Sequence, residues 1–332
     1  MRCSGIMLDI SMHGIECDDL RKAYRNVQAL DGVSLVADAG KVLALLGSNG
    51  SGKTTTVRIL TTQVKQDSGT ARVCGNDVLR EAAAVRKVIG LTAQETHIDK
   101  YITGAEYMNL VARLRHIPRK SRKQEITVLL EEFELADKAH IPAGNYSGGM
   151  RRRLDIAASL LGSPAILFLD EPSNGLDPHS RKRLWGVIRQ RAHEGATILI
   201  TTQYMEEADA LADSIVVLAY GRVIARGTPG ELKDQIRGRA VELALSGPEE
   251  IAKATAILTA LEIQAGPGED PDALQFVMPL SGITLVELLR HLDAQGVAIN
   301  DVIARRPTLD EAFLHLTSEV ERSVEQALLG AA

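Results

Sequence analysis

The stretch Gly47-Ser48-Asn49-Gly50-Ser51-Gly52-Lys53-Thr54 decides the fold of this chain. It follows the apolar run from Val42 to Leu46, which predicts a buried β-strand. The glycines let the backbone curl so that successive N–H groups point inward, and a helix that begins directly afterwards adds its positive N-terminal end. We therefore expect a strand, a tight loop and a helix that together cradle phosphate groups.

The same stretch matches the P-loop pattern G-x-x-x-x-G-K-[S/T] in the strand-to-helix context that this motif needs. Lys53 is expected to reach the β- and γ-phosphates of a nucleotide as a point charge, and the Thr54 hydroxyl to bind Mg²⁺. An ordinary glycine-rich turn is the competing interpretation, and the complete motif argues against it. The expected nucleotide-binding residues here are Gly47, Asn49, Gly50, Ser51, Gly52, Lys53, Thr54 and Thr55.

Two adjacent acids, Asp170 and Glu171, follow a second apolar run, Ala165 to Leu169. Ligands of open α/β sheets gather at the carboxyl ends of the strands. Asp170 is therefore expected to support Mg²⁺, and Glu171 to polarise the attacking water as a general base. Taken alone, such a pair is more typical of a solvated strand end, but the P-loop in the same chain favours the catalytic interpretation.

A third motif, Tyr146-Ser147-Gly148-Gly149-Met150, precedes the helix-compatible segment Arg151 to Leu161. A serine N-cap followed by two glycines leaves a helix N-terminus open to a phosphate. One nucleotide cradle and one separate phosphate site suggest that two copies of the chain meet head to tail and complete each other's pockets. An ordinary Ser-Gly-Gly turn would be favoured for this pentapeptide in isolation.

The 332 residues are enough for one large domain followed by a small one. Strand-like and helical stretches alternate over residues 14–238, which indicates an α/β domain on a mostly parallel sheet, and residues 103–162 are mostly helical in pattern. Residues 239–332 read as a small α+β accessory domain and tail, with a last helix that begins at a capping box on Thr308 and Glu311. Residues 1–13 form an N-terminal extension.

The overall charge and composition exclude several kinds of protein. A formal net charge of −5 argues against a protein that wraps nucleic acid, and no uncharged apolar run approaches the roughly 20 residues that cross a bilayer. The 3 cysteines lack metal-ligand spacing and do not suggest a disulfide scaffold. Basic clusters are interpreted as solvated helix faces; they are 119–123, 151–153, 181–183 and 305–306.

These motifs, in this order, resemble the ATP-binding subunits of ABC transporters across residues 14–238. The implied fold is the P-loop NTPase ABC nucleotide-binding domain with its helical subdomain, followed by the small C-terminal α+β domain. The resemblance implies that Tyr24 stacks on adenine, that Gln94 touches Mg²⁺, and that Ser147 and Gly149 contact the ATP of the opposite copy. It also implies that Asn174-Gly175-Leu176-Asp177 crosses the dimer seam.

Three segments are similar to one branch, the exporters of the daunorubicin/doxorubicin-resistance type: Tyr146 to Ala157, Thr201 to Asp209 and Pro307 to Leu314. One position departs from the wider family, because Gln203 stands where most ABC ATPases have a histidine. A glutamine amide can donate a hydrogen bond to the γ-phosphate but cannot carry a proton. We therefore expect Gln203 to hold the γ-phosphate in position, and we count it among the catalytic residues together with Glu171 and Lys53.

The resemblance implies an ATP-hydrolysing subunit that dimerises around two Mg²⁺-ATP molecules and drives a separate integral-membrane permease from the cytoplasmic face of the cell membrane. Export of a drug-like or lipid-like amphipathic cargo is the expected direction. The alternative is a soluble ABC ATPase that acts on ribosomes or DNA; such relatives usually carry two cassettes or long coiled coils, which this chain lacks. A catalytically weak regulatory module is a third interpretation, against which the intact Lys53, Asp170 and Glu171 argue.

Overall fold

The computed structural model describes residues 13–94, 98–235, 238–261, 263, 265–268, 270–279, 283–314 and 316–317. The chain divides into two compact units, Met1–Thr228 and Pro229–Ala332. The short helix α8 (Pro229–Asp234) belongs to the second unit, although the sequence-based boundary at Gly238 assigns it to the first. None of the helices among the described residues combines the length and the apolar character needed to cross a membrane.

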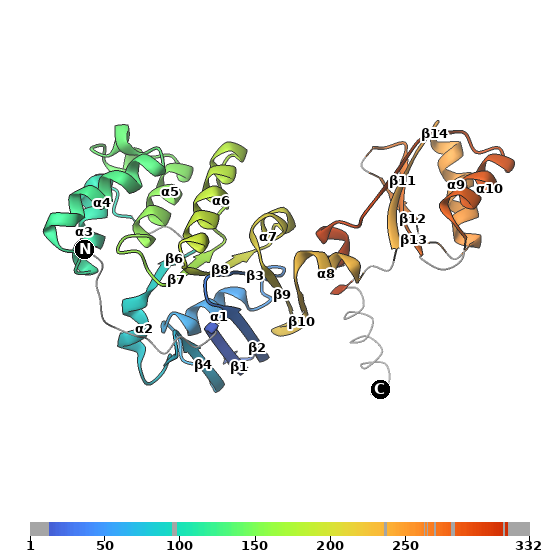
Figure 1. Ribbon diagram of the computed structural model, residues 1–332. Helices are drawn as coiled ribbons and strands as arrows, with labels where there is room; N and C mark the ends of the chain where they lie inside the picture. Colours follow the sequence, from blue (N-terminus) through green and yellow to red (C-terminus); the bar gives the residue numbers. More distant parts are fainter. Residues whose placement is uncertain are drawn as a thin grey trace. The chain divides into compact units, whose positions relative to one another are not determined.

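The first unit is built on a six-stranded sheet in the order β10-β9-β3-β8-β7-β6 (Figure 1). All neighbours run parallel except the edge strand β10, which pairs antiparallel with β9. The central strands β3, β7 and β8 are buried along their whole length, because helices cover both faces of a parallel sheet. The strands are β3 (Val42–Leu46), β6 (Ile89–Thr92), β7 (Ile166–Asp170), β8 (Thr197–Thr202), β9 (Ser214–Ala219) and β10 (Arg222–Gly227).

A second, antiparallel sheet in the order β2-β1-β4-β5 packs against this core. Its long hairpin alternates buried and exposed residues, so that Ile15, Leu20 and Leu35 join the same hydrophobic cluster as Leu43 and Phe168 of the parallel sheet. Cys17 is buried in this cluster, and Cys17 and Cys74 are both free thiols. The strands are β1 (His13–Tyr24), β2 (Val27–Asp38), β4 (Ser68–Val73) and β5 (Asn76–Asp77).

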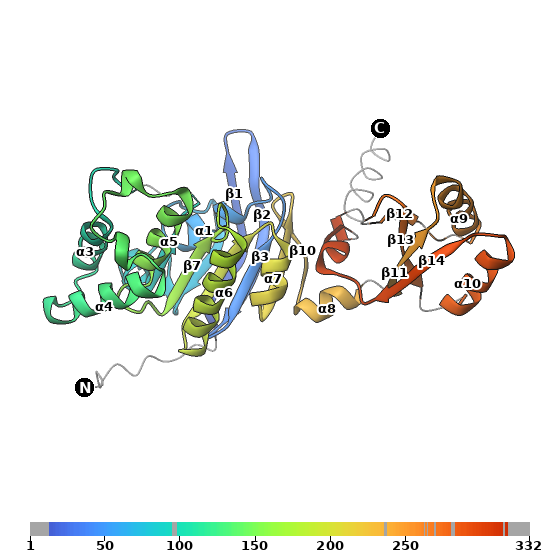
Figure 2. The same ribbon diagram turned by 90° about the horizontal axis from the view of Figure 1, so that it is seen from above.

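Three helices, α3, α4 and α5, gather at one end of the first unit (Figures 1 and 2). They fall within the stretch 103–162 that the sequence predicts to be helical. A capping box on Thr103 and Glu106 starts α3 (Gly104–Leu114), Pro118 precedes α4 (Arg119–Glu132), and Ser147 caps α5 (Gly148–Ser159). The other helical elements are α1 (Lys53–Leu60), α2 (Ala82–Val88), η1 (Ala136–Lys138), η2 (Ala143–Asn145), α6 (Pro178–His193) and α7 (Met205–Leu211).

The second unit has its own four-stranded antiparallel sheet in the order β12-β13-β11-β14, with its own hydrophobic cluster beneath α9 and α10. The predicted capping box closes the start of the last helical segment, since Thr308 N donates to Glu311 Oε2 at 2.7 Å and Glu311 N donates to Thr308 Oγ1 at 3.3 Å. The elements are β11 (Gly238–Leu245), α9 (Pro248–Ala260), β12 (Ala265–Pro267), β13 (Ala273–Pro279), α10 (Leu285–Ala294) and β14 (Ile299–Arg305).

Candidate active site

The loop from Gly47 to Gly52 connects the carboxyl end of β3 to the N-terminus of α1, as the motif predicts. Lys53 is only 4% exposed, and its Nζ donates to the carbonyls of Gly47 (2.8 Å) and Ser48 (3.0 Å). Burial lowers the pKa of Lys53, and the nearby carboxylates of Glu171 and Asp170 raise it again in part. The ammonium group is therefore desolvated and held inside the loop, where it attracts anions strongly.

Close packing requires glycine at positions 47 and 52 of the loop, and a left-handed backbone favours it at positions 50 and 52. A Cβ atom on Gly47 would lie 2.4 Å from the Leu218 carbonyl oxygen and 2.5 Å from Ser51 Oγ. Gly52 has φ 109°, and a Cβ there would lie 2.8 Å from the Ala29 carbonyl oxygen. The buried Ser51 hydroxyl has no hydrogen-bond partner among the described residues. A loop that only glycine can form, with a polar atom left open, fits a bound phosphate.

Asp170 and Glu171 lie at the carboxyl end of β7 and are 3% and 6% exposed. Thr201, on the neighbouring strand β8, connects them: its hydroxyl donates to Asp170 Oδ1 and accepts from Glu171 N at 3.0 Å. Thr54 Oγ1 lies 3.5 Å from the same Asp170 Oδ1. The P-loop hydroxyl and the strand-end carboxylate therefore face each other.

The two glutamines come from the ends of the remaining neighbouring strands. Gln94 follows β6, and its Nε2 lies 3.4 Å from Glu171 Oε2. Gln203 is half-buried and directly follows β8, which lies between β3 and β7. Because parallel strands end at the same edge of the sheet, the loops that carry Lys53, Gln94, Glu171 and Gln203 all emerge there.

A cavity of about 140 Å³ lies at this edge, and Thr54, Gln94 and Asp170 are among its lining residues. Hydroxyl, amide and carboxylate oxygens are the donor types that Mg²⁺ accepts, usually together with water and substrate phosphates. Among the described residues no cluster of three or more His, Cys, Asp or Glu could hold a metal alone. The donor set therefore fits a Mg²⁺ ion that is carried in with a nucleotide.

The Ser-Gly-Gly segment forms the N-terminus of α5. Ser147 Oγ accepts from Met150 N at 3.1 Å, and both Ser147 and Gly148 are exposed. A Cβ on Gly149 would lie 3.5 Å from the Gly175 carbonyl oxygen, so this helix end lies against the loop Asn174–Asp177. The two segments assigned to the dimer seam from the sequence are therefore neighbours within one chain.

Tyr24 ends β1 and is 41% exposed, with Lys22 Nζ 5.6 Å from the ring centroid. Its strand partner is Val27, two residues before Ala29, which packs against Gly52 of the P-loop. An exposed ring at this hairpin end is available for stacking on a base. Of the other predicted binding residues, Asn49 and Gly50 are exposed and Thr55 is half-buried.

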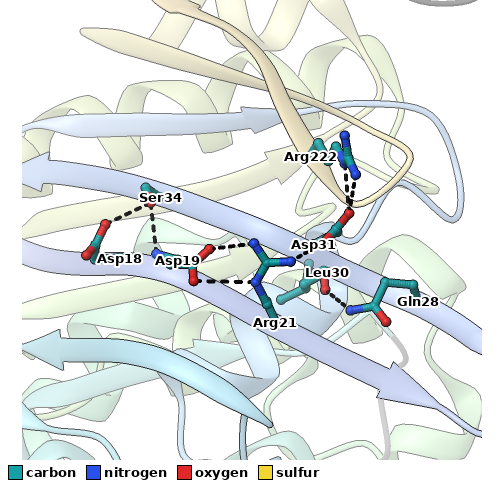
Figure 3. Close-up of polar contacts among 8 residues, drawn as sticks. All are labelled: Asp18, Asp19, Arg21, Gln28, Leu30, Asp31, Ser34 and Arg222. Atoms are coloured by element: carbon teal, nitrogen blue, oxygen red, sulfur yellow. Dashed lines mark hydrogen bonds and ion pairs between the residues drawn. The ribbon is translucent and has the colours of Figure 1, made fainter. Parts of the chain in front are cut away.

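A charge network holds this hairpin against the turn between β9 and β10 (Figure 3). Arg21 on β1 donates to Asp31 on β2, and Arg222 on β10 donates to the other oxygen of Asp31, with Nε–Oδ2 at 2.8 Å. The Arg222 hydrogen bond holds the pKa of Asp31 below its ordinary value. Asp31 N also donates to the Gly221 carbonyl, and Gly221 N donates to the Ser51 carbonyl. The network therefore connects the hairpin to the P-loop backbone.

Sequence reasoning missed two residues of this site. In the sequence, Thr201 only begins the segment Thr201 to Asp209 that is similar to the exporter branch, and it has no predicted role at the site. The interpretation of residues 151–153 as a solvated helix face is wrong for Arg152, which is 4% exposed and donates to carbonyls beside Glu171. Helical spacing is the signal that could have revealed it, because Arg152 shares a face of α5 with the buried Ile156 and Ser159.

Comparisons with known proteins show the family to which the chain belongs. The profile of the family described as ABC transporter matches residues 30–174. The daunorubicin resistance ATP-binding protein DrrA3 of Streptomyces coeruleorubidus is 43% identical over 315 residues, which are 94% of this chain and 98% of the relative. The daunorubicin/doxorubicin resistance ATP-binding protein DrrA of Streptomyces peucetius is 42% identical over 320 residues, which are 94% and 96% of the two chains.

Solved structures show the same fold. The ATP-binding subunit of an ABC transporter aligns with a TM-score of 0.63 at 28% identity, over 67% of this chain and 92% of the other. The ATP-binding cassette MJ0796, solved as a dimer bound to ADP and Pi, aligns with a TM-score of 0.61 at 22% identity, over 64% and 98%.

Proposed function

Since the chain belongs to the ABC transporter ATP-binding proteins, we propose that its site hydrolyses Mg²⁺-ATP between two copies of the chain. Membership makes the chain an ATPase subunit that powers a membrane permease. The observation that carries the assignment of residues is the meeting of Lys53, Gln94, Asp170 and Glu171 at one edge of the parallel sheet.

Binding rests on the P-loop and the strand end beside it. The glycine loop and the N-terminus of α1 hold the phosphates through backbone N–H groups, and Lys53 adds a desolvated positive charge. Thr54, Asp170 and Gln94 hold Mg²⁺, which neutralises charge on the phosphate oxygens when it is bound. Tyr24 stacks on the adenine.

Hydrolysis rests on Glu171 and Gln203. Glu171 accepts the proton of the attacking water as a general base, while Gln94 donates to its carboxylate. Gln203 donates a hydrogen bond to the γ-phosphate and keeps it in line with the water. In the dimer, Ser147 and Gly149 of one copy contact the nucleotide of the other, and the loop Asn174–Asp177 crosses between them.

We further propose that the permease is an integral-membrane protein and that this subunit docks on it at the cytoplasmic face of the cell membrane. The relatives named for daunorubicin and doxorubicin resistance support an amphipathic, drug-like or lipid-like cargo moved outward. Affinity capture from mild detergent extracts tests this. A polytopic membrane protein is expected, whereas recovery of ribosomes or DNA-repair factors without one would contradict the transport role.

Replacement of the base tests the assignment directly. Glu171→Gln removes the proton acceptor but keeps the shape, so ATP binding should persist while kcat falls on the order of 10²- to 10⁴-fold. ATP-bound dimers should then accumulate on gel filtration with ATP and Mg²⁺. Glu206→Gln, at an exposed glutamate on α7, is the matched control and should hydrolyse ATP normally. Monomers together with wild-type turnover in Glu171→Gln would remove Glu171 from this role.

A further inference from the structure

The side chain of Arg152 crosses from α5 to two other segments of the chain. Its Nε donates to the Pro172 carbonyl at 3.3 Å, and its Nη2 donates to the carbonyls of Glu171 (2.8 Å) and Asp170. Its Nη1 donates to the Ala93 carbonyl. Because a guanidinium is planar and its N–H groups are fixed in direction, one side chain holds these carbonyls at set positions.

The carbonyls that Arg152 holds belong to the catalytic segments. Ala93 immediately precedes Gln94, and Asp170 to Pro172 surround the proposed base. Glu171 has φ 50°, a left-handed conformation that a non-glycine residue keeps only when its surroundings enforce it. Thr201 holds the amide side of Glu171, and Arg152 holds its carbonyl.

The same helix carries the segment proposed to meet the partner's nucleotide. Ser147 caps α5, and Arg152 lies five residues further on, about 7–8 Å along the helix axis. Between them the helix backbone is hydrogen-bonded and cannot flex freely. A displacement of the Ser147 end would therefore move the guanidinium, and with it the backbone that carries Glu171 and Gln94.

We propose that Arg152 is a positioning residue that couples the two nucleotide sites of the dimer. This inference rests on the proposed function. A nucleotide held by the partner copy engages the N-terminus of α5, and Arg152 transmits that engagement to Glu171 and Gln94 of its own chain. Each copy then becomes competent for hydrolysis only when the dimer has closed, which makes turnover cooperative in ATP.

Arg152→Lys tests the proposal. Lysine keeps the charge and the aliphatic stem but is a single point donor that cannot span these carbonyls. We expect the affinity for ATP to stay within about twofold, kcat to fall at least about tenfold, and the Hill coefficient for ATP to approach 1. If Arg152 had only a structural role, its replacement would lower thermal stability, but kcat would not fall more than the affinity for ATP.

Arg153→Lys is the matched control. Arg153 lies on the same helix, and its Nη1 donates to the Phe133 carbonyl (3.0 Å) and to Glu134 Oε2 (3.1 Å), away from the catalytic segments. It should keep the wild-type kcat and cooperativity. Wild-type values in Arg152→Lys, or an equal loss in both variants, would overturn the proposal.

Two further measurements keep the outcome unambiguous. If wild type does not hydrolyse ATP, or Glu171→Gln does not dimerise with ATP, the proposed function fails; if both hold and Arg152→Lys is unchanged, only the coupling fails. Should Arg152→Lys not fold, amide hydrogen exchange on Glu171→Gln decides without it. ATP should slow exchange in residues 91–94 and 170–173 together with 147–155, and protection of 147–155 alone would reject the coupling.

Discussion

At the residue scale, the two carboxylates of the site differ in how the backbone holds them. Asp170 is the last residue of β7 and stays in register with Thr201, which keeps its side chain beside Thr54. Glu171 leaves the strand in a left-handed conformation, and its carboxylate lies next to Gln94 instead. Adjacent residues thus serve different groups, Asp170 the proposed metal ion and Glu171 the proposed water.

The amide of Gln203 provides a prediction about pH. It has no titration near pH 6.5, so in the proposed mechanism it orients the phosphate without carrying a proton. Gln203→Ala should lower kcat much more than it weakens ATP binding, because the lost hydrogen bond matters most in the transition state. Gln203→His should retain activity and add a pH dependence on the acid side. The measurement is kcat against pH, and an unchanged kcat in the Ala variant would show that Gln203 is only a strand-end residue.

Glu207 is a fully buried acid that the proposed chemistry does not use. It lies on α7, and its Oε1 accepts from Trp185 Nε1 at 3.2 Å and from the Ser173 hydroxyl. Burial raises the pKa of Glu207, and the hydrogen bond from Ser173 only partly offsets this; Arg181 is the nearby cation. The carboxyl connects the helix after Gln203 to the segment after Glu171.

Because the pKa of Glu207 is higher in the folded protein than in the unfolded chain, the folded protein loses stability as the pH rises. The stabilisation associated with the proton on Glu207 is complete below the unfolded pKa of about 4.3 and is lost as pH rises through the higher folded value. Glu207→Gln keeps the acceptor oxygen without the ionisation, so its Tm relative to wild type should rise between pH 5 and 8. Glu206→Gln, at the 69%-exposed neighbour, should show no such trend. A constant Tm difference for Glu207→Gln across this range would contradict the expectation.

At the scale of elements, three α-helices of the first unit begin at a side-chain cap: α3 at Thr103, α5 at Ser147 and α6 at Asp177. Thr103 Oγ1 accepts from Glu106 N at 3.2 Å, and Glu106 Oε2 accepts from Thr103 N at 2.8 Å, which closes the start of α3. Asp177 caps α6 without a reciprocal capping box: its carboxylate accepts from Ser180 N at 2.9 Å, and the hydrogen bonds from Ser180 lower its pKa to about 2. Asp177 also belongs to the loop Asn174–Asp177, one of the two segments proposed to form the dimer seam.

Removal of the α3 cap should weaken the helical part of the first unit. Thr103→Ala leaves the Glu106 amide without its acceptor and should cost about 1 kcal/mol, which corresponds to roughly 2–4 °C in Tm for a unit of this size. Thr127→Ala, at an exposed site within α4, is the control and should not lower Tm, because alanine is the better helix former. Calorimetry of both variants is the measurement, and equal Tm values would show that the capping box does not stabilise α3.

At the scale of the whole molecule, the first unit contains every residue assigned to the nucleotide site. The second unit has its own sheet and its own core of residues such as Leu243, Leu258, Phe276 and Leu288. Its described residues present no phosphate-binding loop. We propose that this unit docks on a partner or stabilises the dimer, and its separate fold allows a test by truncation.

Deletion of the second unit tests whether ATP binding needs only the first unit and whether transport needs both. A chain that ends at Thr228 should bind ATP with an affinity close to that of the full protein, because the P-loop and its core are intact. Transport with the permease should be impaired. Nucleotide titration and a transport assay on the same variant are the measurements. A folded, truncated chain that cannot bind ATP would show that the second unit contributes to the site.

Local patterns in the sequence predicted the local geometry: the P-loop between β3 and α1, the acids at the end of β7, and the caps on Ser147 and Thr308. Glycine placement, side-chain caps and apolar runs act over a few neighbouring residues, so they can be read from the chain directly. The same patterns, together with the resemblance that they carry, predicted the α/β class and the small second domain. They also assigned the roles of Lys53 and Glu171, which stay predictions until they are tested.

Which of these segments touch each other depends on the tertiary structure. The order of strands β3, β8, β7 and β6 brings Gln94 within 3.4 Å of Glu171, 77 residues away, and the burial of α5 turns Arg152 from an apparent surface charge into the residue that holds the catalytic backbone. Glu207 and Ser173 meet for the same reason. A polar group that is buried must be hydrogen-bonded, because it has lost its contact with water. The partner often comes from a segment far away in the sequence, so a local sequence pattern cannot identify it.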